Sequence, residues 1–352
     1  MSHATRVQTA PLAEREHPVP AALSDSPPSP ARRALLLGAS GAALAATAPR
    51  LANAAASIAT YNDNDLLNFA LNLEYLEANF YYLAAFGTTI DLPNAASTAA
   101  GAPVIAMSGT GTQGSVVAKA NARVPFSFVT VGAYATETAL EEGRHVALLR
   151  TTLGAAAVAQ PALDLESSFN ALASAAGIAS PFDPFASDLN FLLGAFVFED
   201  VGVTAYRGLA PLLSTTLTGR TNLQTASGLL AVEAYHAGLI RTSLLTLDPA
   251  GTLGYLPATQ KIAALRAQLS LAANNQAANP DDLGISTTAT VTLQNGTSAP
   301  ATQLVDANPL TAQVFSRNTN QVLNIVTGGG ATAAGSAAKG LFFPAGLNGR
   351  FV

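Results

Sequence analysis

Two short stretches of the chain could bind a transition metal: Glu142-Gly143-Arg144-His145 and Glu233-Ala234-Tyr235-His236. Each has the form Glu-x-x-His. Because residues three apart share one face of a helix, each stretch would direct a carboxylate and an imidazole at one point. Both ligand types suit first-row transition metals.

Chance rarely produces this pair of stretches. Beyond residue 54, the chain has two histidines and eight glutamates, and each histidine has a glutamate three positions before it. Random placement of the glutamates over about 298 residues would give both pairs with a probability below about 0.1%. The alternative interpretation is that the two histidines are ordinary surface or core residues.

Two further glutamates are predicted on helices that carry no histidine. An apolar stripe with helical spacing runs through residues 63–86, where Asn62 could cap the start and Gly87 the end, and Glu74 lies in the middle of that stripe. Another predicted helix, the third of the four in chain order, is opened by Pro181 and ends near residue 213. It carries Glu199 on its inner face. In both, a tyrosine follows the glutamate at the same spacing, Tyr81 after Glu74 and Tyr206 after Glu199.

The two Glu-x-x-His stretches lie on predicted helices at about 125–154 and 221–247. The resulting order, Glu, Glu-x-x-His, Glu, Glu-x-x-His, is typical of a four-helix bundle with a dimetal-carboxylate site. Four carboxylates buried in a bundle core destabilise it unless they are paired or metal-bound. No Arg or Lys is placed to neutralise all four, whereas two divalent cations would. The sequence therefore predicts Glu74, Glu142, His145, Glu199, Glu233 and His236 as metal ligands.

The chain divides into three predicted parts. Residues 1–54 resemble a twin-arginine export signal, with Arg32-Arg33, a weakly apolar stretch and Ala52-Asn53-Ala54 as a cleavage site. Residues 55–250 would form the bundle, with an insertion at 88–122, and 251–352 would pack on it as an extension. The apolar run of the signal is too short and too rich in Gly and Ala for a stable membrane span. We expect export by the twin-arginine machinery to the periplasm or outside the cell.

The extension has a different composition from the bundle. Within the extension, a helix is expected at 258–273. Outside it, a further short helix is expected at 165–176, before the third bundle helix. The rest of the extension is rich in Asn, Thr and Gly, and its short alternating runs at 288–293 and 321–326 favour strands. The fold class is therefore mainly α, with an irregular, partly β C-terminal extension.

Composition excludes several kinds of function. The net charge is −5, so no basic surface for nucleic acid is indicated. The chain has no cysteine, which excludes disulfides, iron–sulfur clusters and thiolate zinc sites.

The sequence resembles the ferritin-like superfamily, and within it the exported bacterial ferritin-like proteins grouped with plant desiccation-related proteins. The resemblance covers residues 62–247 and, loosely, the C-terminus. It is carried by LNFALNLEYLEANFYY at 67–82, EEGRHVALL at 141–149, FEDVGVTAYR at 198–207, VEAYH at 232–236 and GLFFPAGLNGRF at 340–351.

The resemblance implies roles for the site residues. Glu142 and Glu233 would bridge two iron or manganese ions, Glu74 and His145 would complete one metal position, and Glu199 and His236 would complete the other. Glu77, Glu141 and Asp200 could accept hydrogen bonds from the imidazoles, or could lie on solvated helix faces. Tyr81 and Tyr206 could hydrogen-bond to ligands or take part in redox chemistry, or could be packed core residues.

The resemblance leaves the reaction open. The expected function is redox chemistry with O2 or H2O2 in protection against oxidative or drying stress. The alternatives are a metal-binding protein without turnover and a structural stress-associated protein. The absence of Cys excludes a rubredoxin-like module. Manganese catalases separate the Glu and His of their fourth helix more widely than this chain does, so the resemblance to them is weaker. The long insertion and extension favour a monomer or small oligomer over a 24-subunit cage.

Overall fold

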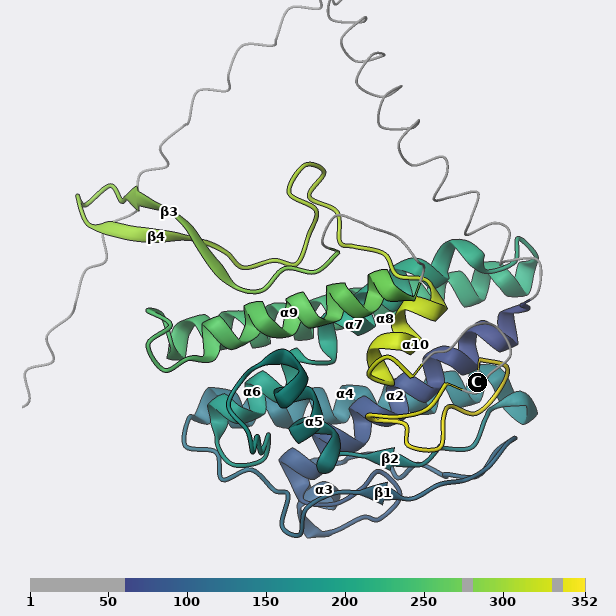
Figure 1. The fold of residues 1–352 in the computed structure, drawn as a ribbon. Helices are drawn as coiled ribbons and strands as arrows, with labels where there is room; N and C mark the ends of the chain where they lie inside the picture. Colours follow the sequence, from purple (N-terminus) through teal and green to yellow (C-terminus); the bar gives the residue numbers. More distant parts are fainter. Residues whose placement is uncertain (1–60, 274–280, 331–337, 352) are drawn as a thin grey trace, which may run out of the picture. The chain divides into compact units, whose positions relative to one another are not determined.

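The computed structural model describes residues 61–273, 281–330 and 338–351, apart from the side chains of 288, 289 and 300. The predicted export signal at 1–54 therefore lies outside the described residues. The chain is mainly helical, and helices α2, α4, α6–α7 and α8 form a four-helix bundle (Figure 1). The predicted fold class is confirmed.

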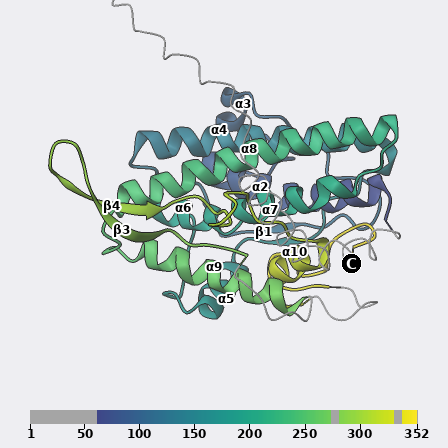
Figure 2. The same cartoon turned by 90° about the horizontal axis from the view of Figure 1, so that it is seen from above.

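The first bundle helix, α2 (Asp63–Phe86), is buried along almost its whole length, from Leu66 to Phe86. Asn62 caps its start in a capping box with Asp65, and Gly87 ends it in the left-handed conformation at φ 72°. A helix buried on all sides must be covered by more than its bundle partners. Here α5 (Ser167–Ala176), α10 (Thr319–Val326) and the C-terminal segment supply that cover (Figures 1 and 2).

The second bundle helix, α4 (Val129–Leu153), packs along α2. It begins four residues later than the predicted start at Pro125. No side chain of its own caps it. Asp188 accepts hydrogen bonds from the backbone N–H groups of Ser127 (2.9 Å) and Phe128 (3.1 Å) instead, so a residue about 60 positions away holds the start of this helix.

The third bundle helix is broken, contrary to the single helix predicted over 181–213. It consists of α6 (Asp188–Phe196) and α7 (Glu199–Leu209), followed by a 3-10 turn at Ala210–Leu212. The break leaves backbone carbonyls without helical partners. Arg266 of α9 (Tyr255–Ala272) donates to two of them, Phe196 O at 2.6 Å and Val197 O at 3.3 Å.

The fourth bundle helix, α8 (Leu217–Leu247), packs against α6 and α7. It begins at Leu217, earlier than predicted, because Thr216 caps it by accepting from Gly219 N at 3.0 Å. Asp188–Leu212 is the one stretch of the described residues long and apolar enough to cross a membrane (mean hydropathy 1.3). Since 89% of the most apolar part of this stretch is buried, the stretch also fits the core helix of a bundle.

The insertion between α2 and α4 contains α3 (Ala95–Ala100) and β1 (Val116–Val117). β1 pairs in parallel with β2 (Leu163–Asp164), which precedes α5. The extension contains α9 and an antiparallel hairpin of β3 (Ser286–Thr292) and β4 (Ser298–Gln303). The strand predicted at 321–326 is wrong. Those residues belong to α10, which Asn318 and Gln321 start with a capping box.

Candidate metal centre

The structure brings the six predicted ligands together in the middle of the bundle. They form two groups in which the ligand atoms lie within 4.8 Å of one another. The first group is Glu74, Glu142, His145 and Glu233, and the second is Glu142, Glu199, Glu233 and His236. Glu142 and Glu233 belong to both groups, which is the arrangement of two neighbouring metal positions joined by two carboxylates.

Each imidazole faces its group through Nδ1. His145 Nδ1 lies 3.3 Å from Glu74 Oε2, 3.5 Å from Glu142 Oε2 and 3.7 Å from Glu233 Oε1. His236 Nδ1 lies 3.0 Å from Glu142 Oε1 and 3.4 Å from Glu199 Oε2. The two rings are nearly parallel, with centroids 6.0 Å apart.

The potential metal-ligand atoms of this cluster are buried and lie close to one another, but none makes a hydrogen bond of good geometry. They are Glu74 Oε2, both oxygens of Glu142 and of Glu233, Glu199 Oε2, and the Nδ1 atoms of His145 and His236. Buried polar atoms without partners are costly and rare in folded proteins. Carboxylate oxygens and imidazole nitrogens converging in this way fit two divalent first-row metals, which would satisfy these atoms together.

Burial and mutual repulsion shift the pKa values of the carboxyls. Burial raises the pKa of Glu74 to about 7. The pKa of Glu199 is also raised, and that of Glu233 lies well above its usual range, in both cases first because of burial. For Glu142, burial is outweighed by the two imidazoles, and its pKa is lowered.

The pKa values of the two imidazoles are also raised, but by the nearby carboxylates and against the effect of burial. Burial lowers the pKa of His145, but Glu142 and Glu74 outweigh it and the net shift is upward. The pKa of His236 is likewise raised by Glu199 and Glu141 against the effect of burial. Protons therefore partly neutralise the cluster when no cation does, and metal binding must displace them.

Two tyrosines hydrogen-bond to predicted ligands across the bundle. The hydroxyl of Tyr81 on α2 donates to Glu199 Oε1 on α7, and the hydroxyl of Tyr206 on α7 donates to Glu74 Oε1 on α2. The repeated Glu-x6-Tyr spacing produces this exchange because the two helices run antiparallel. Each tyrosine leaves the other oxygen of its glutamate, Oε2, free to face the cluster.

Glu141, Glu77 and Asp200, the three acidic residues near the predicted ligands in the sequence, make different contacts. Glu141 Oε2 lies 2.8 Å from His236 Nε2, and this hydrogen bond lowers the pKa of Glu141. Glu77 is buried at 4% exposure, and its pKa is well raised, first by burial and then by Glu233. Asp200 contacts neither imidazole, although it follows Glu199 directly.

Asp200 belongs to a buried ion-pair network that joins the extension to the bundle. It receives Arg241 Nη2 at 2.8 Å and Arg266 Nη2 at 2.9 Å, and Arg266 also reaches Asp282 at 2.7 Å. Arg317 pairs with Asp282 at 2.8 Å and with Asp281 at 3.1 Å. Asp200, Asp282 and Asp306 lie close enough together to hold a metal ion, but the carboxylates of Asp200 and Asp282 are already bound by guanidinium groups.

Gly202 is a functional position that the sequence did not identify as such. A Cβ added there would lie 2.3 Å from Glu233 Oε2 and 3.4 Å from Glu77 Oε1. Glu233 can therefore reach the cluster past α7 because residue 202 has no side chain. Gly202 lies three residues after Glu199 on the inner face of its helix, and this spacing was the available signal.

The comparisons with known proteins agree with this geometry. The family model described as "Ferritin-like domain" matches residues 62–246. The chain is 35% identical over 216 residues to the desiccation-related protein PCC13-62 of Craterostigma plantagineum, covering 59% of this chain and 62% of the relative. It is 30% identical over 186 residues to the ferritin-like catalase Nec2 of Nesocodon mauritianus, covering 52% of this chain and 53% of that relative.

These similarities have a limited extent. The chain spans 62% and 53% of the lengths of these two curated relatives, so it matches each over part of its length. No solved structure is significantly similar to the chain. The family model covers all six predicted ligands and both tyrosines.

Proposed function

Because this chain belongs to the ferritin-like domain family, we propose that it is an exported protein that holds two iron or manganese ions and uses them in redox chemistry with O2 or H2O2. The observation that carries the proposal is the pair of four-residue groups that share Glu142 and Glu233. The eight unpartnered donor atoms in and between these groups support it. The printed names of the two relatives, one desiccation-related and one a catalase, favour a role in oxidative or drying stress.

The residues of the chain would hold and orient the ions. Glu74 and His145 would complete one position, Glu199 and His236 the other, and Glu142 and Glu233 would serve both. Two such ions, when bound, supply open coordination positions and electrons for O2 or peroxide. Four residues would hold each ion, and other ligands such as O2 or peroxide could bind beside them.

Hydrogen bonds from other side chains to the predicted ligands would fix those ligands in place. If His236 donates its Nε2 proton to Glu141, its Nδ1 keeps a lone pair that faces the cluster. Tyr81 and Tyr206 hold one oxygen of Glu199 and Glu74, which restricts the rotation of each carboxylate. The buried, mostly apolar surroundings exclude bulk water from the site.

Folding before export would explain how iron or manganese is selected. Copper and zinc bind such ligand sets more tightly than manganese or iron does. A chain folded in the cytoplasm would take its metal there, and the paired Arg32 and Arg33 are typical of a signal for a route that carries folded proteins. The assembly we propose is a monomer or a small oligomer, since the insertion and the extension would crowd a hollow shell.

A matched pair of variants on α4 tests the proposal. Protein loaded with Fe(II) or Mn(II) is assayed for O2 release from H2O2 and for O2 consumption. Glu142→Gln should lose metal and activity, whereas Glu137→Gln, which changes an exposed residue of the same helix, should keep both. Loaded wild-type protein that is no more active than the free ions would refute the redox function and leave the non-catalytic alternative.

A further inference from the structure

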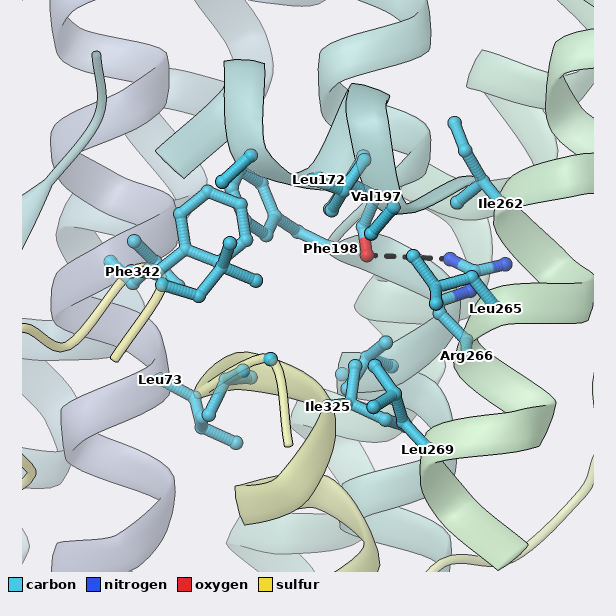
Figure 3. Close-up of a pocket in the computed structure, with 18 of the residues that line it drawn as sticks. Leu73, Leu172, Val197, Phe198, Ile262, Leu265, Arg266, Leu269, Ile325 and Phe342 are labelled. Carbon is cyan, nitrogen blue, oxygen red and sulfur yellow. Dashed lines mark hydrogen bonds between the residues drawn. The ribbon is translucent and has the colours of Figure 1, made fainter. Parts of the chain in front are cut away.

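A mainly apolar cavity of about 150 Å³ lies beside the candidate metal centre. Figure 3 shows its walls: Leu73 from α2, Leu172 from α5, Ile262 and Leu269 from α9, Ile325 from α10 and Phe342 from the C-terminal segment. The bundle supplies one side and the extension the other. The cavity therefore exists only because the extension packs on the bundle.

The inner end of the cavity is formed by Glu77 and Gly202. Both belong to the layer that separates the cavity from the candidate metal centre, because oxygens of Glu77 and Glu233 converge on the same side of Gly202. Glu77 is not a member of either ligand group. A molecule at the inner end would contact Glu77, with Glu233 directly behind it.

The lining residues become exposed or half-buried on the side of α5 and α9, so a molecule would enter the cavity from this side. Ala171 and Ala175 of α5 line it and are exposed, and Leu265 and Leu269 of α9 line it and are half-buried. These side chains are small or apolar, so they leave an entrance without a charged residue.

The wall has two ionisable side chains, the carboxyl of Glu77 and the guanidinium of Arg266, among mainly apolar residues. A buried water needs two to four hydrogen-bond partners. Arg266 already donates to Phe196 O, Val197 O, Asp200 and Asp282, which leaves only its Nε without a partner. Apolar cavities of about this volume accept molecules of the size of benzene.

We propose that this cavity is a binding site for a small, mainly apolar organic molecule of about six to ten non-hydrogen atoms. The molecule enters between α5 and α9 and places its inner end against Glu77. This site is separate from the metal ligands, and its occupancy requires neither metal nor turnover.

Benzene is the probe for the test. Calorimetric titration of the full chain should show saturable binding with a dissociation constant of about 1 mM or tighter. Ala171→Phe and Ala175→Phe each place an aromatic ring in the entrance and should weaken binding about tenfold or more. Ser174→Phe adds the same ring at an exposed position of α5 that does not line the cavity, and it should bind benzene as the wild type does.

Two results would overturn the proposal. One is the absence of saturable binding to the wild-type protein. The other is binding that Ala171→Phe and Ala175→Phe leave unchanged, which would place the benzene elsewhere. Thermal unfolding of each variant without benzene checks that the ring has not disturbed the fold. If one of Ala171→Phe and Ala175→Phe does not fold, the other still provides the test.

Discussion

Replacing Gly202 with alanine should weaken metal binding strongly while leaving the fold intact. The added methyl carbon would lie 2.3 Å from Glu233 Oε2 and 3.0 Å from its Cδ. These atoms are the far end of a flexible side chain. The carboxylate can therefore turn away without any movement of the backbone.

The size of the effect follows from this distance. To restore an ordinary contact, Glu233 Oε2 must move by roughly 1 Å, whereas metal–ligand distances tolerate deviations of about 0.2 Å. Displacing a shared ligand this far should lower metal affinity by about 100-fold. The alanine itself favours the helix by about 0.5–1 kcal/mol, so the free energy of unfolding of the metal-free protein should change by no more than about 1 kcal/mol.

Gly228→Ala is the matched control, because Gly228 is exposed on α8 and a Cβ there meets nothing within 4 Å. Chelator competition gives the metal affinity of each variant, and urea denaturation of the metal-free protein gives its stability. Equal metal affinity in Gly202→Ala and Gly228→Ala would refute the claim that Glu233 is a ligand held at this position.

Three further changes test separate parts of the account. Tyr206→Phe removes the hydrogen bond to Glu74 and should lower metal affinity about tenfold in the same competition assay, whereas unchanged affinity would mean that the tyrosine only packs. Burial, then Asp282 and Asp200, raises the pKa of Asp306 to about 8, so the folded state keeps a proton that the unfolded state releases above about pH 4, and stability falls as pH rises between these values. In urea denaturation, Asp306→Asn should therefore gain about 4 kcal/mol over wild type between pH 5 and pH 9, at about 1.36 kcal/mol per pH unit up to the folded pKa, and a constant difference would contradict this. Replacing Arg32 and Arg33 with lysine should retain a folded precursor in the cytoplasm on cell fractionation, and secretion at the wild-type level would rule out the proposed route.

The clustering of the six predicted ligands could be foreseen because it depends on local spacing. Glu142 with His145 and Glu233 with His236 are three residues apart, and that spacing alone places each pair on one helix face. Glu74 and Glu199 were found because each interrupts an apolar stripe. Helix periodicity reports burial, and a buried carboxylate needs a partner.

The features that were not predicted depend on residues distant in the sequence. The break before Glu199 is stabilised by Arg266, which comes from α9 in the extension. Asp200 follows a ligand, but adjacent helical residues point about 100° apart, so it faces Arg241 and Arg266. Neither contact has a signal in the sequence near residue 199.

The wrong strand at 321–326 has a different cause. Apolar residues in so short a run fit a strand or a helix equally well by periodicity. The deciding signal was the capping box, in which Asn318 is followed three residues later by Gln321. This motif begins three residues before the run predicted as a strand and includes its first residue, Gln321.

The number of metal ions bound per chain is the sharpest test of a dinuclear centre in this bundle. Protein reconstituted with Fe(II) or Mn(II), desalted and analysed by mass spectrometry of the metals should hold two ions per chain, one for each ligand group. Changing both His145 and His236 to alanine should remove most of this metal, with Glu137→Gln as the control that retains it. Reconstituted wild-type protein that holds fewer than one ion per chain would contradict the account.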